Sequence, residues 1–72
     1  MRLMIHTIRV GDVLTMVGPD GKYSEPFTLG DLPRLAADTI WIYRANDAPI
    51  VVGRDYGLGA SFILHSRLAR QP

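Results

Sequence analysis

The chain has 72 residues, of which 47% are hydrophobic and 21% charged, and its formal net charge is +1. This balance is typical of a globular protein and excludes a disordered one, which would have less apolar content and more net charge. It also differs from the strongly basic balance of most nucleic-acid-binding domains. The chain contains no cysteine, so disulfides and zinc–thiolate sites are excluded.

A chain of this length forms one domain, residues 1–72, near the lower size at which buried surface suffices for folding. Because disulfides are excluded, we expect the chain to gain stability by forming a homo-oligomer. Residues 1–7 include Arg2 and an apolar run that His6 interrupts, so they lack the apolar region of a secretory signal. No segment approaches the ~20 apolar residues of a membrane span. We therefore expect a cytoplasmic protein that does not contact the membrane.

In residues 3–29 we expect three strands. Residues 3–10 are apolar on both sides of an extended chain, which predicts a strand covered on both faces. After a bend at Gly11-Asp12, residues 13–17 predict a second strand. The motif Gly18-Pro19-Asp20-Gly21-Lys22 predicts a hairpin turn. The returning strand, residues 23–29, contains Pro26, which lacks a backbone donor and therefore predicts an edge position.

The next segment, residues 31–38, is the one predicted helix. Asp31 is a suitable N-cap, and Pro33 is tolerated in a first helical turn. Leu32, Leu35 and Ala36 would then share one face. We expect this short helix to connect the first hairpin to the strands that follow.

Residues 39–67 contain most of the β-branched and aromatic residues, and turn residues divide them into three runs. We predict strands at 39–45, 49–55 and 61–67, separated by a turn at Asn46-Asp47-Ala48 and a break at Gly57-Leu58-Gly59. A C-terminal helix beginning at Ser61 is the alternative for the last run. The Gln71-Pro72 tail is expected to fray.

These elements predict a mainly β fold, a small antiparallel barrel or curled sheet, SH3-like, with five or six strands and one short helix. The predicted core consists of Ile8, Val13, Leu29, Leu35, Ile40, Ile42, Val51, Ile63 and Leu64. Residues 10–18 together with Gly21-Lys22 resemble the Gly-Asp-Val openings of small SH3-like barrels such as KOW-type RNA-binding modules. The second glycine-rich half of that pattern is missing, because Glu25-Pro26-Phe27 stands in its place, so we transfer no function from the resemblance.

The sequence predicts no catalytic residues, no metal site and no cofactor. His6 and His65 are the only histidines, and two ligands without placed carboxylates do not make a metal site. Ser66 follows His65 directly, and neighbouring residues of a strand point to opposite faces, so they cannot form a catalytic pair. We therefore expect a protein that is not an enzyme.

The candidate binding residues lie around the predicted strand 39–45, which carries Trp41 and Tyr43 on one face and Ile40, Ile42 and Arg44 on the other. Either face could be the core. If the isoleucines point inward, the aromatic pair lies near the surface, and if both faces are buried, one of them belongs to an oligomer interface. The candidate partner-binding residues are Trp41, Tyr43, Arg44, Arg54 and Tyr56.

Two functions are consistent with these residues. The first is a non-enzymatic protein-interaction or assembly module that binds a protein partner through a sheet face or edge. The alternative is a small nucleic-acid-binding β-barrel, because aromatic and arginine side chains together can stack bases. Asp47 and Asp55 oppose the alternative, since fixed carboxylates repel phosphates, so we favour the first.

Overall fold

The computed structural model describes residues 1–68 and has six strands and one short helix in that range. The elements in chain order are β1 (Arg2–Leu3), β2 (Val13–Val17), β3 (Phe27–Ala36), β4 (Ile40–Ala45), β5 (Ala48–Gly53), α1 (Arg54–Gly59) and β6 (Ser61–Ser66). In this part of the chain no helix is long and apolar enough to cross a membrane. The expected fraying of Gln71-Pro72 lies outside the described residues.

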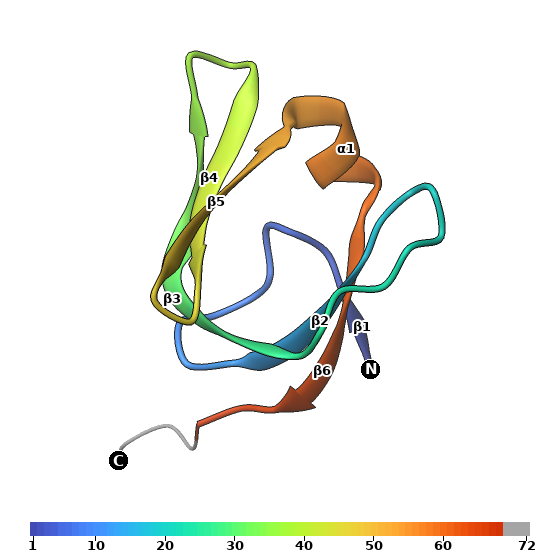
Figure 1. Ribbon diagram of the computed structural model, residues 1–72, viewed down its shortest axis with the longest axis vertical. Coiled ribbons are helices and arrows are strands. Elements are labelled where there is room, and N and C mark those ends of the chain that lie inside the picture. The colour runs from blue at the N-terminus through green and yellow to red at the C-terminus, as the bar shows by residue number, and fades with distance from the viewer. Residues whose placement is uncertain (69–72) are drawn as a thin grey trace.

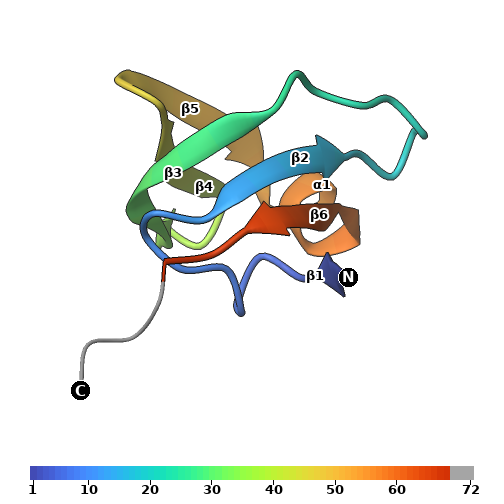
Figure 2. The same cartoon turned by 90° about the horizontal axis from the view of Figure 1, so that it is seen from below.

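All six strands belong to one antiparallel sheet in the order β1-β6-β2-β3-β4-β5. The predicted mainly β, curled architecture is confirmed. Figures 1 and 2 show the sheet curling around the segment that follows β1, with α1 at one end and a long loop between β2 and β3 projecting from the side. The sheet does not close, because β1 and β5 remain its two edges.

The predicted helix at residues 31–38 is wrong, because most of this segment belongs to the long strand β3. The pairing of β3 with β4 shifts register between Leu29 and Asp31 and again between Asp31 and Arg34. These irregularities leave Pro33 outside the ladder, where its missing N–H costs no hydrogen bond. Pairing along β3 and β4 thus overrides a weak local preference for helix.

Of residues 3–10 only Leu3 lies in a strand, the two-residue β1, before the chain turns away, so the predicted long first strand is wrong. The side chain of Thr7 accepts a hydrogen bond from the Met4 N–H and donates one to the Met4 carbonyl, which stabilises the turn. Ile5 and Ile8 are nevertheless buried, at 2% and 3% exposure. The apolar pattern of residues 3–10 therefore correctly indicated that this segment is buried. The buried structure is a turn inside the curled sheet and not a strand.

The strand predicted at residues 23–29 begins only at Phe27. Tyr23 makes an isolated bridge with Val17, and the Ser24 N–H donates to the Met16 carbonyl. Pro26 precedes β3, which lies between β2 and β4 in the interior of the sheet, so the predicted edge position is also wrong. Pro26 ends the loop and does not mark an edge.

The last part of the chain follows the prediction more closely. Strands β4, β5 and β6 match the three predicted runs within one or two residues, and the helical alternative for residues 61–67 is wrong. The predicted glycine break is instead the six-residue helix α1, with Gly53 as N-cap and Asp55 in its first turn. Gly57 is buried against the indole of Trp41, which explains a glycine inside this helix.

The core lies between the two halves of the curled sheet and the turn of residues 5–8. It consists of Ile5, Ile8, Leu14, Met16, Phe27, Leu29, Trp41, Tyr43, Ala60 and Phe62. Of the predicted core, Ile8 and Leu29 are buried, whereas Leu35 is 37% and Val51 58% exposed. The other five, Val13, Ile40, Ile42, Ile63 and Leu64, are half-buried. The prediction chose the wrong face of β4, because Trp41 and Tyr43 point inward.

Candidate protein-interaction surface

Two of the five predicted binding residues, Trp41 and Tyr43, lie in the core at 6% and 3% exposure. The Trp41 Nε1–H donates to the Arg54 carbonyl at 3.2 Å, and the ring of His6 meets the indole edge-on with 5.3 Å between centroids. The Tyr43 hydroxyl donates to the Met16 sulfur at 3.4 Å, and burial raises the pKa of Tyr43 to about 12. Neither aromatic ring is presented to a partner.

Arg54 and Tyr56 lie on α1, at one end of the curled sheet. They border an open hollow of about 410 Å³ together with Asp38, Thr39, Gly53 and Asp55. The Tyr56 hydroxyl donates to Asp20 at 3.3 Å. Burial and the nearby Asp20 carboxylate raise the pKa of Tyr56. The Tyr56 hydroxyl therefore already has a hydrogen-bond partner, Asp20, within the same chain.

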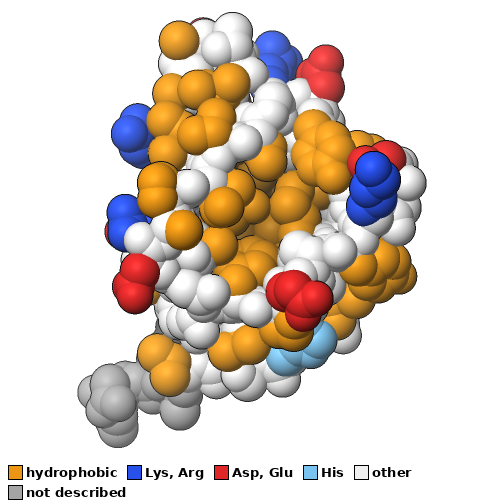
Figure 3. All heavy atoms as spheres, in the orientation of Figure 1, with side chains coloured by type: hydrophobic (Ala, Val, Ile, Leu, Met, Phe, Trp, Pro, Cys, Tyr) orange, Lys and Arg blue, Asp and Glu red, His pale blue; other side chains and the backbone are white. Residues whose placement is uncertain are grey.

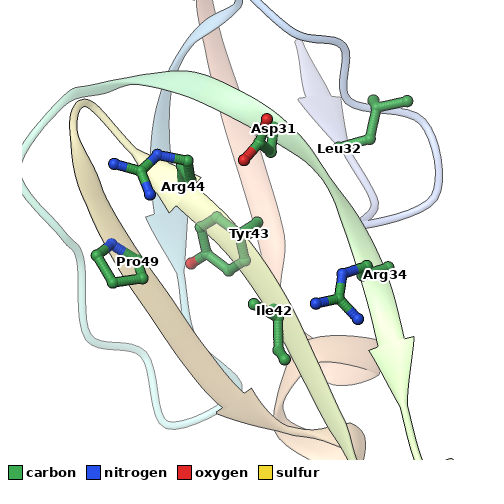
Figure 4. Close-up of a pocket in the computed structure, with 7 residues that line it drawn as sticks. All are labelled: Asp31, Leu32, Arg34, Ile42, Tyr43, Arg44 and Pro49. Atoms are coloured by element: carbon green, nitrogen blue, oxygen red, sulfur yellow. The ribbon is translucent and has the colours of Figure 1, made fainter.

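Arg44 lies on a different surface, the outward side of β3, β4 and β5, which we call the outer face. The ladder register places eight side chains there: Asp31, Arg34, Ala36, Ile40, Ile42, Arg44, Pro49 and Val51. A hollow of about 450 Å³ on this face is lined by Asp31, Leu32, Arg34, Ile42, Tyr43, Arg44 and Pro49. In Figure 4, Ile42 lies beside Arg34, and Arg44 lies farther along β4.

The outer face combines apolar surface with two arginines in different states. Arg44 is half-buried and donates to the Asp47 carbonyl in the β4–β5 turn. Arg34 is exposed, and its side chain makes no ion pair or hydrogen bond within residues 1–68. Leu32 and Val51 are each 58% exposed. In Figure 3 basic side chains lie along the margin of the view on the side of β3 and β4, and others lie at its top and right.

The strand β5 forms a free edge beside the outer face. Its sequence, Ala-Pro-Ile-Val-Val-Gly, carries no charge, and four of its six residues are exposed. Edge strands with exposed backbone groups usually carry charges or bulges that prevent pairing with other chains. Here Pro49 is the only such device, and the ladder with β4 is regular from Ala48 to Gly53. The edge is therefore competent to pair.

The structure thus separates the five predicted residues among the core, α1 and the outer face. The sequence did not indicate that Arg34, Pro49 and Val51 are surface residues of one face. Pro49 carried a usable signal, because a proline within a strand indicates an edge. Arg34 was placed on a helix that does not form, so its proximity to Arg44 could not be foreseen.

The polar residues that could carry chemistry are dispersed within residues 1–68. His65 Nε2 lies 2.7 Å from the Thr15 hydroxyl, and Ser61 accepts a hydrogen bond from Arg2 at 2.8 Å. His6 instead contacts Trp41. In this range no three histidine or acidic residues lie together as a metal-binding group.

A scan against protein-family models, a search of curated proteins and a search of solved structures each find no match to this chain.

Proposed function

We propose that this protein is a non-enzymatic interaction or assembly module that binds a protein partner through the free edge of β5 and the adjoining outer face. The observation that carries the proposal is the uncharged, exposed and regularly paired β5 at the edge of the sheet. An extended segment that pairs with such an edge gains backbone hydrogen bonds, and side-chain contacts supply specificity. This function requires only non-covalent binding and no chemical reaction.

The outer face offers the side-chain contacts for that segment. Ile42 and Val51 lie opposite each other in the β4–β5 ladder and form a small apolar row. Arg34 and Arg44 flank this row and can each hold a carboxylate through their forked donors. A bound strand with β-branched residues next to an acidic residue fits this combination.

The strand order supports an SH3-like architecture, which we propose for the sheet. Strands β6, β2, β3, β4 and β5 are neighbours in that order, and a single helical segment stands directly before β6. Such folds host many unrelated functions, so the functional proposal depends on the surface and not on the fold. The cytoplasmic location expected from the sequence stays a prediction.

A displayed library of random linear decapeptides is a suitable probe. We expect enrichment of extended sequences with β-branched residues beside an Asp or Glu. Val51→Lys should abolish their binding, because it places a charge on the edge strand. Leu58→Lys, at an exposed position of α1, is the matched control and should bind as the unmodified chain does. Failure to enrich any peptide, together with absence of self-association, would contradict the proposal.

The alternative, binding of single-stranded nucleic acid, is favoured by one observation, the presence of Arg34 and Arg44 on one face. Asp31 on the same face opposes it, and the buried Trp41 and Tyr43 provide no stacking platform. Anisotropy of a labelled oligonucleotide tests it directly, since a buried Trp41 is a poor reporter. Salt-sensitive binding that is lost in the Arg34→Gln, Arg44→Gln double variant would establish the alternative.

A further inference from the structure

We infer that the partner of β5 is β5 of a second copy of this chain, paired antiparallel about a two-fold axis through Val51. The inference deepens the proposed function and rests on it. It follows from the backbone groups that β5 presents at its free edge, from the side chains on its two faces and from the absence of charge on the strand.

The first step is to assign which backbone groups face outward. Pro49 has no N–H, and it pairs with Arg44 in the ladder. In an antiparallel pair, residues alternate between those that exchange hydrogen bonds and those that do not. The two-residue turn makes Ala45 and Ala48 an exchanging pair, so the neighbouring Pro49 belongs to the other class. By alternation, Val51 and Gly53 share that class, and their N–H and C=O groups point to the free edge.

These outward groups have only one internal use within residues 1–68. Gly53 is the N-cap of α1, and its carbonyl accepts the first hydrogen bond of the helix. The Val51 N–H and C=O, the Pro49 C=O and the Gly53 N–H make no backbone bond to a loop or turn. The free edge therefore offers two donors and two acceptors.

A two-fold axis at Val51 satisfies all of these groups. Val51 then exchanges two hydrogen bonds with Val51 of the second copy. Pro49 lies opposite Gly53 of the second copy, whose N–H donates to the Pro49 carbonyl. Pro49 has no N–H to donate to the Gly53 carbonyl opposite it, but that carbonyl already accepts the first hydrogen bond of α1. No backbone polar group of the paired strands is therefore left without a partner.

Other symmetric registers satisfy fewer groups. With Pro49 opposite Val51, each Val51 carbonyl faces a proline that cannot donate, and both Gly53 N–H groups lie beyond the paired region. With Val51 opposite Gly53, each Val51 N–H points at a carbonyl that already serves the helix. The register centred on Val51 is therefore the one that the sequence of β5 fits.

The side chains agree with this register on both faces of the sheet. On the outer face, Val51 meets its own copy and extends the row begun by Ile42. On the inner face, Ile50 lies opposite Val52 of the second copy, and both residues are half-buried against the core. β-Branched pairs of this kind stabilise antiparallel strands.

The absence of charge on β5 permits pairing between two copies. β5 itself carries no charge, so two copies meet without like-charge repulsion. Beyond each end of the paired region, the register sets Asp47 of one copy near both Arg54 and Asp55 of the other, so the end charges do not select the arrangement.

The chain has no cysteine, so a single introduced thiol tests the register. In Val51→Cys the two copies of residue 51 would have Cα atoms about 5.5 Å apart, within the range of a disulfide. In Pro49→Cys the two copies of residue 49 would be separated by about 13 Å along the strands, which is too far. Under mild oxidation we expect at least fivefold more covalent dimer from Val51→Cys than from Pro49→Cys.

Equal trapping of the two variants, or a sedimentation profile showing only an 8 kDa species, would overturn the inference. Either result leaves the proposed function intact if peptides from the displayed library still bind and Val51→Lys abolishes that binding. Greater trapping of Val51→Cys without any peptide binding would support self-pairing as the whole role of the edge.

Discussion

At the scale of single residues, Asp12 joins three parts of the chain. Its side chain is 1% exposed and accepts two hydrogen bonds from Arg67, at 2.9 and 2.8 Å, and one from the Arg9 N–H at 2.8 Å. Its backbone carbonyl accepts from the Leu29 N–H. The carboxylate therefore connects the N-terminal turn to the end of β6.

The hydrogen bonds from Arg67 lower the pKa of Asp12, with burial opposing. Because the folded state lowers this pKa, its contribution to stability is complete above the unfolded value of about 3.9 and is lost as the pH falls through the folded value. We expect Asp12→Asn to reduce the free energy of unfolding by about 2 kcal/mol at pH 7. Urea unfolding from pH 7 to pH 2 should show the difference from the unmodified chain shrinking with acid. Exposed Asp31 is the control, since Asp31→Asn should have little effect at any pH.

Gly57 shows how one residue position depends on a distant one. A Cβ at Gly57 would lie 2.4 Å from Trp41 Cδ1, and the indole is held by its bond to the Arg54 carbonyl. We expect Gly57→Ala to lower the free energy of unfolding by about 1 to 3 kcal/mol, although alanine favours helix. Gly59→Ala in the same helix meets only Pro19, at 3.2 Å, and should cost little. Thermal melts of the two variants check the contrast, which equal stabilities would contradict.

At the scale of elements, the strands with regular alternation could be predicted from the sequence, and the helix could not. β4, β5 and β6 carry concentrated β-branched and aromatic residues between turn signals. Residues 31–38 contain helix-compatible residues, but their conformation depends on pairing with β4, which local sequence does not encode. The six residues of α1 include two glycines, which have low helix propensity. Packing of Gly57 against Trp41 therefore stabilises a helix that the local sequence does not favour.

The turn between β3 and β4 offers a test of that long-range control. Ala37 and Asp38 both have positive φ, of 51° and 56°, and the Thr39 N–H donates to the Ala36 carbonyl. Positive φ costs alanine about 1 kcal/mol or more, and glycine avoids this cost. Ala37→Gly should therefore raise the free energy of unfolding. The net gain should be about 0.5 kcal/mol, because glycine also increases the conformational entropy of the unfolded chain, which opposes folding.

The neighbouring Ala36 is the matched control, because it pairs with Ile40 in the ladder. Ala36→Gly should lower the free energy of unfolding by about 0.5 to 1 kcal/mol. Denaturant melts of both variants measure the two effects. If both substitutions destabilised the protein equally, the turn would not have the conformation described.

At the scale of the whole molecule, the sequence indicated a curled, mainly β domain but not its functional surface. The choice between the two faces of β4 depends on which face meets the turn of residues 5–8, and no periodicity reveals that. Trp41 and Tyr43 were attractive as binding residues because aromatic side chains anchor interfaces, yet the same size makes them the best fillers of a small core. The free edge follows from strand order, which a single sequence does not give.

The open edge also makes stability depend on concentration if the second copy binds there. A partner that binds the folded chain and not the unfolded chain stabilises the folded state by mass action. We therefore expect the thermal midpoint Tm of the unmodified chain to rise as its concentration increases from micromolar to millimolar. Val51→Lys should have a Tm that does not change over the same range, because two lysines would meet on the two-fold axis. Pro49→Ala should keep the concentration dependence, since the four proposed hydrogen bonds use only the carbonyl of residue 49. A flat Tm for the unmodified chain, or an equal rise for Val51→Lys, would show that β5 does not join two copies.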